Sequence, residues 1–150
     1  MPRIYLDACC LNRPFDDQSQ DRIRLEAEAV LLILIRVQQH EDWIWVSSDV
    51  VQYEVEQTPD SERRRRVREL VSFADVEADV TDDVAKRAVE LQSRGFKAVD
   101  AMHVACAEAS RGDVLLTTDD RFLRAARRNA GQIHVRVENP IDWLREVANP

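Results

Sequence analysis

Apolar residues follow two patterns along the chain, short continuous runs and longer segments with helical spacing. The runs at residues 4–6, 43–46 and 114–117 and the alternating segment 133–137 have the length and composition of strands. The segments between them place apolar residues three or four positions apart, which is typical of amphipathic helices. Strands that alternate with helices predict an α/β fold, in which helices cover both faces of a parallel sheet.

The expected helices begin at residues whose side chains cap helices well. Asp21 would cap a long helix over residues 22–39, and Ser48 or Asp49 would cap the next, short one. Apolar residues of the long helix are expected on one face, namely Ile23, Ala27, Val30, Leu31, Leu34 and Val37. The further helices are expected from Pro59 to residue 73, from Thr81 to Gly95, over residues 98–110 and 120–129, and from Pro140 onward.

Composition indicates one soluble domain over residues 1–150. With 45% hydrophobic residues, 33% charged residues and three glycines, the 150-residue chain is typical of a compact, helix-rich protein. Its longest apolar stretch, residues 29–35, is too short to span a bilayer, and no signal peptide precedes the first strand. Cys9, Cys10 and Cys106 lack metal-ligand spacing, which predicts free thiols in a reducing cytoplasm.

Four acidic residues lie where one structural element gives way to the next. Asp7 follows the first strand, Glu54 lies in the helix after the second, Asp100 opens an alanine-rich helix, and Asp119 follows a later strand. In a parallel α/β sheet, ligands bind at the carboxyl ends of the strands. Carboxylates gathered there without Cys or His partners repel one another unless a hard cation joins them. The pattern therefore predicts Mg²⁺ or Mn²⁺ and metal-assisted phosphate chemistry.

The net charge of −7 argues against a nucleic-acid partner, because phosphate binding usually needs a basic surface. Two divalent cations at the four carboxylates would offset more than half of that charge, so the objection is weakened. Residues 63–66 are four consecutive arginines, the one dense basic cluster, and a helix spreads them around its axis. We expect a solvated helix with salt bridges to Glu62 and Glu69; the alternative is a contact with RNA or a partner.

Several segments carry a resemblance to a known family. They are Tyr5-Leu6-Asp7; Ser48 with Glu54; Val99-Asp100-Ala101 with His103 and Ala105; Leu116-Thr117-Thr118-Asp119-Asp120-Arg121-Phe122; and Val137-Glu138-Asn139-Pro140. In order and spacing the chain resembles PIN-domain ribonucleases, which include the VapC-type toxins of bacterial toxin–antitoxin pairs. The resemblance implies a single-domain, three-layer α/β/α PIN-like fold with a central parallel sheet.

The resemblance also assigns roles to residues. The family's acidic positions fall on Asp7, Glu54, Asp100 and Asp119, which implies Mg²⁺- or Mn²⁺-dependent endonucleolytic cleavage of RNA, leaving a 5′-phosphate and a 3′-hydroxyl. Asp7, Asp100 and Asp119 would hold the metal directly or through water, and Glu54 would be a ligand or orient the attacking water. Thr117 occupies the place of a hydroxyl that supports the site in the family.

Other polar residues have two interpretations. Asn12 and Arg13 would contact the substrate phosphate, or form a turn and a solvated surface. His103 is more simply explained by helix packing than by metal binding, since no second His or Cys completes a ligand set. Cys9 and Cys10 are expected to be small buried packing residues.

Neighbouring acids compete with two of the four. Asp120 follows Asp119, and either could cap the next helix. Near Glu54, we expect Asp49 to cap the helix and Glu56 to lie on another face.

The resemblance implies a small antitoxin partner and a homodimer. The run over residues 31–35 is too apolar for a one-sided surface helix, which indicates core packing, extended in the alternative by a dimer interface. A stand-alone PIN nuclease of RNA maturation and an inactive PIN-like scaffold remain open. A haloacid-dehalogenase-like phosphatase would need an Asp where Cys9 stands.

Overall fold

The computed structural model describes residues 1–39 and 42–148, which fold around one parallel sheet. The sheet has five strands in the order β3-β2-β1-β4-β5. Their bounds are β1 (Arg3–Leu6), β2 (Ile44–Ser48), β3 (Val76–Ala78), β4 (Val114–Leu116) and β5 (Arg136–Glu138). Because β1 is central and pairs in parallel with both β2 and β4, the carboxyl ends of these three strands lie together.

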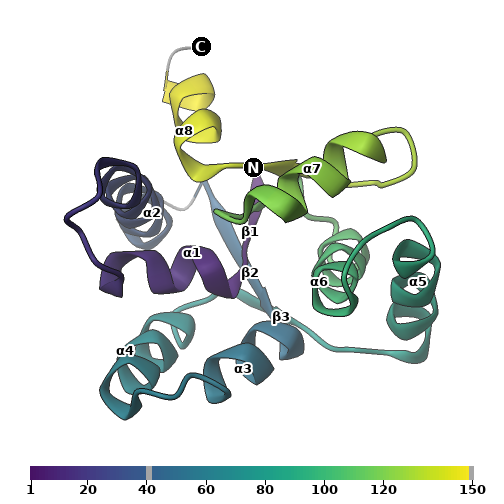
Figure 1. The fold of residues 1–150 in the computed structure, drawn as a ribbon, viewed down its shortest axis with the longest axis horizontal. Coiled ribbons are helices and arrows are strands. Elements are labelled where there is room, and N and C mark those ends of the chain that lie inside the picture. Colours follow the sequence, from purple (N-terminus) through teal and green to yellow (C-terminus); the bar gives the residue numbers. More distant parts are fainter. Residues whose placement is uncertain (40–41, 149–150) are drawn as a thin grey trace.

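Helices cover both faces of the sheet, so the molecule has three layers. The helices are α1 (Ala8–Asn12), α2 (Asp21–Gln39), α3 (Asp49–Glu56), α4 (Ser61–Val71), α5 (Asp82–Gln92), α6 (Ala98–Ala109), α7 (Asp120–Arg128) and α8 (Pro140–Ala148), with a 3₁₀ turn at Arg13–Phe15. Figure 1 shows α1, α2 and α4 on one side of the sheet and α5 and α6 on the other. Within the described residues, no helix is both long and apolar enough to cross a bilayer.

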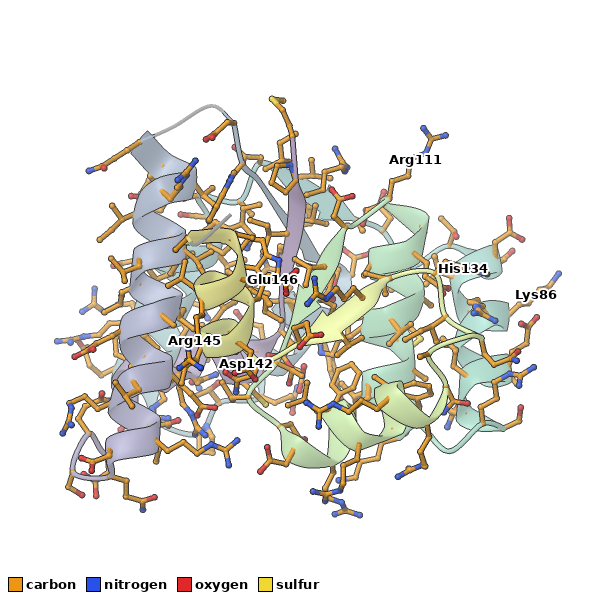
Figure 2. The ribbon with its side chains drawn as sticks, turned by 90° about the horizontal axis from the view of Figure 1, so that it is seen from above. Lys86, Arg111, His134, Asp142, Arg145 and Glu146 are labelled. Carbon is orange, nitrogen blue, oxygen red and sulfur yellow. The ribbon has the colours of Figure 1, made fainter. Side chains whose placement is uncertain are left out.

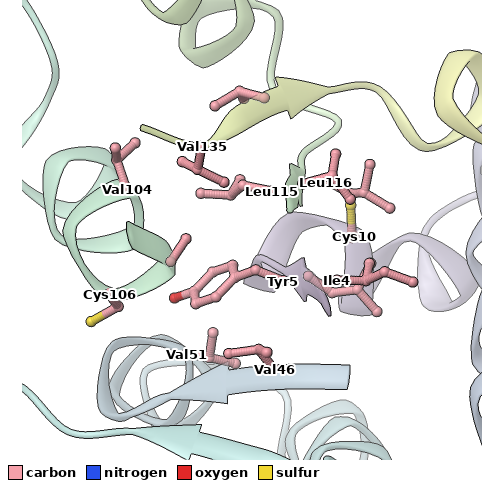
Figure 3. Close-up of a cluster of buried hydrophobic side chains, with 14 of the residues drawn as sticks. Ile4, Tyr5, Cys10, Val46, Val51, Val104, Cys106, Leu115, Leu116 and Val135 are labelled. Atoms are coloured by element: carbon pink, nitrogen blue, oxygen red, sulfur yellow. The ribbon is translucent and has the colours of Figure 1, made fainter. Parts of the chain in front are cut away.

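The core lies against both faces of the central strand. Ile4, Tyr5 and Leu6 of β1 are fully buried. In Figure 3 the Tyr5 ring lies between Leu115 of β4 and Val46 of β2. A strand buried on both faces needs apolar residues at every position, and this explains why β1 has no polar alternation.

The expected α/β fold with a parallel sheet is confirmed, and several element boundaries differ. Asp21 lies in the first turn of α2 instead of capping it. Ser48 caps α3 by accepting a hydrogen bond from the Val51 N–H at 3.2 Å, so the expectation that Asp49 is the cap was wrong. The Asp49 carboxylate instead accepts from the N–H of Val80, a contact made across the fold.

Other differences concern elements that are short or near a turn. α4 begins at Ser61 with Asp60 as its cap, two residues after the expected start at Pro59. The last strand covers Arg136–Glu138 instead of 133–137, because its pairing register with β4 begins at Arg136. β3 and α1 were not expected, since each is too short to show a periodic pattern.

The apolar run in α2 is divided between core and surface. Ile33 and Leu34 are buried, whereas Leu31, Leu32 and Ile35 are exposed at 42%, 56% and 47%. Leu31 therefore does not belong to the buried face on which it was expected. Core packing accounts for only part of this run.

Candidate active site

Asp7 lies at the junction between β1 and α1. It caps α1, and its carboxylate accepts a hydrogen bond from the Cys10 N–H at 3.0 Å. The Asp7 N–H donates to the carbonyl of Leu116 at 3.2 Å, which fixes the end of β1 against the end of β4. The residue is 2% exposed. Burial raises the pKa of Asp7, and the charge of His103 and hydrogen bonds from Thr117 and Cys10 oppose that rise.

Asp119 has the corresponding place after β4. It caps α7, where its carboxylate accepts from the N–H groups of Arg121 at 2.9 Å and Phe122 at 3.4 Å. Its neighbour Asp120 instead forms a salt bridge with Arg22 at 2.7 Å. Of the two candidate caps, Asp119 is therefore the one that caps α7.

Thr117 connects the two aspartates. Its hydroxyl oxygen accepts from the Asp119 N–H at 3.1 Å, and the hydroxyl is hydrogen-bonded to the Asp7 carboxylate. Thr117 is itself fully buried, which fixes the position of its hydroxyl. Its side chain can fix the relative positions of Asp7 and Asp119, as expected for a supporting hydroxyl.

Asp100 lies in the first turn of α6. Burial, followed by the negative charges of Asp119 and Asp7, raises the pKa of Asp100 to about 6. Glu54 contributes in the same direction. Three other carboxylates therefore act on Asp100, although they come from the cap of α1, from α3 and from the cap of α7. The fold brings the four predicted acidic residues to one locality.

Glu54 is held by a buried hydrogen-bond network. Its carboxylate is hydrogen-bonded to Nε2 of His103, which is buried in α6. Nδ1 of His103 lies 2.6 Å from the Tyr5 hydroxyl, and that hydroxyl lies 2.6 Å from the Ser48 hydroxyl. His103 is thus more than a packing residue. It contacts a site carboxylate, and its position three residues after Asp100 was the signal for this role in the sequence.

Cys9 is the residue whose place the sequence analysis missed. It is exposed, whereas Cys10 is buried, so the expectation of two buried packing residues was wrong for Cys9. The negative charge of Asp7 is the main cause of a raised pKa of the Cys9 thiol. Partial desolvation of this otherwise exposed residue adds to the rise, as do the charges of Glu54, Asp119 and Asp100. Cys9 therefore lies among all four carboxylates. Its spacing of two residues from a capping Asp would have placed it there.

A pocket of about 360 Å³ opens beside the carboxylates. It is lined by Ala8, Cys9, Asn12, Arg13, Asp16, Glu54, Thr118 and Asp119. The Asn12 amide turns back to the carbonyl of Ala8 at 2.9 Å. The Arg13 guanidinium is held at 2.9 Å from the buried carboxylate of Glu26 and at 3.1 Å from Asp16. Arg13 is thus fixed at the pocket wall.

Comparison with known proteins identifies the family. The model of the PIN domain family matches residues 4–128, which is most of the chain. This chain belongs to the PIN domain family. The expected PIN-like fold is therefore confirmed, with its central parallel sheet. No curated protein sequence matches the chain.

Solved PIN-domain structures resemble this chain along almost its whole length. FitAcB from Neisseria gonorrhoeae matches with a TM-score of 0.56 and 18% identity over 91% of this chain and 97% of that one. VapC20 from Mycobacterium tuberculosis, described as a toxin that cleaves the sarcin–ricin loop, matches with a TM-score of 0.57 and 15% identity, covering 89% and 98%. VapBC2 from Rickettsia felis, bound to a promoter DNA fragment, gives 0.55 and 15%, covering 91% and 98%. At these identities the likeness concerns the fold.

PIN-domain nucleases generally use divalent metals, and the donor groups of this PIN domain suit such ions. Carboxylate oxygens are hard ligands. Burial, followed by the negative charges of Asp119 and Asp7, raises the pKa of Asp100, and a bound cation would offset the repulsion between these charges. Among residues 1–39 and 42–148, however, no group of three or more His, Cys, Asp or Glu side chains is already arranged to hold an ion. Glu54 faces His103, and Asp119 faces the amides of α7. Metal binding would require these side chains to turn toward a common point.

Proposed function

We propose that this PIN-domain protein is an endoribonuclease that hydrolyses RNA phosphodiester bonds with Mg²⁺ or Mn²⁺. The observation that carries the proposal is the convergence of Asp7, Glu54, Asp100 and Asp119 at the carboxyl edge of the sheet, where their charges act on one another. A cluster of carboxylates beside an open pocket is suited to hold divalent cations against a phosphate.

The site residues divide the chemistry between binding and proton transfer. When bound, a divalent cation acidifies a coordinated water and neutralises phosphate oxygens. Asp7, Asp100 and Asp119 would hold it directly or through water, from three different helices. Glu54 would be a further ligand or orient the attacking water, with its carboxylate directed by His103.

Three further residues would support substrate and ligands. Thr117 would keep Asp7 and Asp119 in register through its two hydrogen bonds. Arg13, fixed at the pocket wall by Glu26, would offer its remaining hydrogen-bonding capacity to a substrate phosphate. The Asn12 side chain is engaged with α1, so its contribution would be to the shape of the pocket.

We also propose that the chain is the toxin of a type II toxin–antitoxin pair in the cytoplasm. Support comes from solved structures named as VapBC complexes, from Rickettsia felis and from nontypeable Haemophilus influenzae, which share the fold. A small antitoxin would silence an acidic pocket most directly by inserting an Arg, whose planar fork bonds two carboxylate oxygens. The exposed leucines and Ile35 of α2 support a homodimer.

The proposal is tested by incubating RNA with the purified chain in Mn²⁺, in Mg²⁺ and with a chelator. Cleavage should require the metal and should be lost in Asp7→Asn. Asp120→Asn is a matched control, because Asp120 is an exposed carboxylate paired with Arg22 outside the cluster. Metal-dependent cleavage that persists in Asp7→Asn would contradict the assignment. Expression without an antitoxin should slow bacterial growth only while Asp7 is intact, and unimpaired growth would favour a stand-alone nuclease.

A further inference from the structure

Each guanidinium of the arginine cluster at residues 63–66 already has a hydrogen-bond acceptor within the fold. Arg63 binds Asp16 at 2.7 Å, and both Arg65 and Arg66 bind Glu62. Arg64 donates to the carbonyl of Thr58 at 2.9 Å. Because these guanidinium groups already have acceptors, the densest run of positive charge in the sequence offers little to an incoming polyanion.

Cations without such partners gather on another element. Arg121, Arg124 and Arg128 are exposed on α7, and Lys97 is exposed just before α6. In the part of the chain that the structure describes, none of these four side chains forms a salt bridge. Arg124 interacts electrostatically with Asp120. The carboxylate of Asp120 is already bound by Arg22 at 2.7 Å.

The four cations line one groove. Residues 121, 124 and 128 are three and four positions apart, a spacing that places them along one face of α7. With Lys97, Gly95, Ala125 and Asp100 they surround a pocket of about 240 Å³. Figure 1 shows α7 beside the helices α5 and α6, which the segment carrying Gly95 and Lys97 connects. We call this pocket the α7 groove.

The α7 groove begins at the candidate active site. Asp100 lines it, and Asp119, the cap of α7, acts electrostatically on Asp100. Among the described residues, none with an aromatic side chain lines the groove, so they provide no platform on which a base could stack. Its exposed cationic side chains are suited to the phosphates of a strand, and contacts with phosphates carry no sequence information.

We propose that the α7 groove binds the phosphates of the RNA strand on one side of the scissile bond. The inference rests on the proposed nuclease function. It explains how a chain with a net charge of −7 binds a polyanion, since screening limits the influence of distant charges to about 10 Å and the cations nearest the site dominate. The four carboxylates would repel the neighbouring phosphates, and Lys97, Arg124 and Arg128 offset that repulsion next to the point where it acts.

The test compares two pairs of substitutions that each remove two exposed positive charges. Arg124→Gln/Arg128→Gln alters the α7 groove. Lys86→Gln/Arg111→Gln is the control, since Lys86 lies on α5 and Arg111 at the far end of α6, as Figure 2 shows. Neither control residue forms a salt bridge within residues 1–39 and 42–148. Each pair is made in an Asp7→Asn background, so that a fluorescent, unstructured single-stranded RNA is bound without being cut.

Binding is followed by fluorescence anisotropy with Mg²⁺ over a series of KCl concentrations. Each lost phosphate contact should reduce the slope of log K against log salt by about 0.7 for a single strand, so the α7 pair should lower it by about 1.4. The control pair should leave the slope unchanged, and melting temperatures should show that both pairs fold.

If the two pairs gave equal slopes of log K against log salt while the parent chain cleaved RNA, the proposed role of the α7 groove would be wrong and the nuclease assignment would stand. Absence of both cleavage by the parent chain and salt-dependent RNA binding would overturn the two proposals together. Loss of binding in the α7 pair with an unchanged salt slope would also contradict phosphate contact.

Discussion

His103 and Glu54 are joined by a hydrogen bond between the imidazole Nε2 and the carboxylate, at the wall of the acidic cluster. On its other side the imidazole meets the Tyr5 hydroxyl, whose pKa is raised by burial. Tyr5 therefore stays protonated. The imidazole therefore links the buried Tyr5 hydroxyl to the Glu54 carboxylate. A buried network of this kind fixes a carboxylate that would otherwise rotate freely.

The network predicts that His103→Gln lowers the metal affinity of the site without abolishing metal binding. Loss of an outer hydrogen-bond partner typically costs about 10- to 100-fold in metal affinity or activity. We expect a fall in that range in both cleavage rate and metal affinity, the latter measured by calorimetry. Tyr5→Phe should have a smaller effect in the same direction, because the His103–Glu54 contact survives. Unchanged metal affinity in both variants would show that His103 serves packing alone.

Asp7→Asn should abolish cleavage while the protein stays folded. Asn caps helices about as well as Asp, so α1 should keep its cap. The neutral amide also avoids the cost of holding a buried charge, the cause of the raised pKa of Asp7. We expect a melting temperature in chelator that equals or exceeds that of the parent chain. A clearly lower value would mean that the lost activity reflects damage to the fold.

Divalent metal should raise the melting temperature by binding only the folded chain. At a metal concentration about 100 times the dissociation constant, the stabilisation should be about 2.7 kcal/mol. The increase should be smaller in Asp119→Asn and smaller again in Asp7→Asn/Asp119→Asn. If the double variant and the parent chain showed the same increase, the ion would bind elsewhere.

Asp100 should make the metal-free protein less stable as pH rises. Its folded pKa of about 6 exceeds the value of about 3.9 for an unfolded Asp, so the folded state holds the proton more tightly. The contribution of Asp100 to the free energy of unfolding is therefore greatest below about pH 4 and declines up to about pH 6. In chelator, Asp100→Asn should raise the melting temperature near neutral pH and much less in acid. If Asp100→Asn raised the melting temperature equally at all pH values, the charge of Asp100 would not be the cause of the increase.

The proposed homodimer predicts that a charge placed on the exposed apolar face of α2 separates the two chains. Leu32 and Ile35 border an apolar pocket of about 330 Å³ together with Trp43 and Leu144. Light scattering should give twice the single-chain mass of 17.3 kDa, and Leu32→Glu should shift it toward one chain. Val89→Glu on α5 is the matched control, since Val89 is 65% exposed. A parent chain that scatters as a monomer would exclude the dimer.

Local rules predicted most of the fold and the acidic residues of the site. Asp7 and Asp119 could be recognised because each follows a buried strand, a relationship contained in a few neighbouring residues, whereas the short helix that Asp7 caps was not expected. β3 could not be recognised, since its three residues form a strand only by pairing with β2.

Pairing over long sequence separations explains what the sequence analysis missed. Arg63 is neutralised by Asp16, which lies 47 residues earlier, and no spacing rule connects the two. The exposed arginines of α7 can be distinguished from the paired arginines only after such long-range salt bridges are known. The link between His103 and Glu54 likewise depends on how α3 and α6 pack.

The most direct test of the nuclease assignment is the linearisation of a circular RNA by the purified chain. A circle has no ends, so only endonucleolytic cleavage opens it. The account predicts linear products with a 5′-phosphate and a 3′-hydroxyl in Mn²⁺, none in chelator, and none from Asp100→Asn, while Asp120→Asn retains activity. Circles that stay intact in Mn²⁺, or that Asp100→Asn opens as fast as the parent chain, would contradict it.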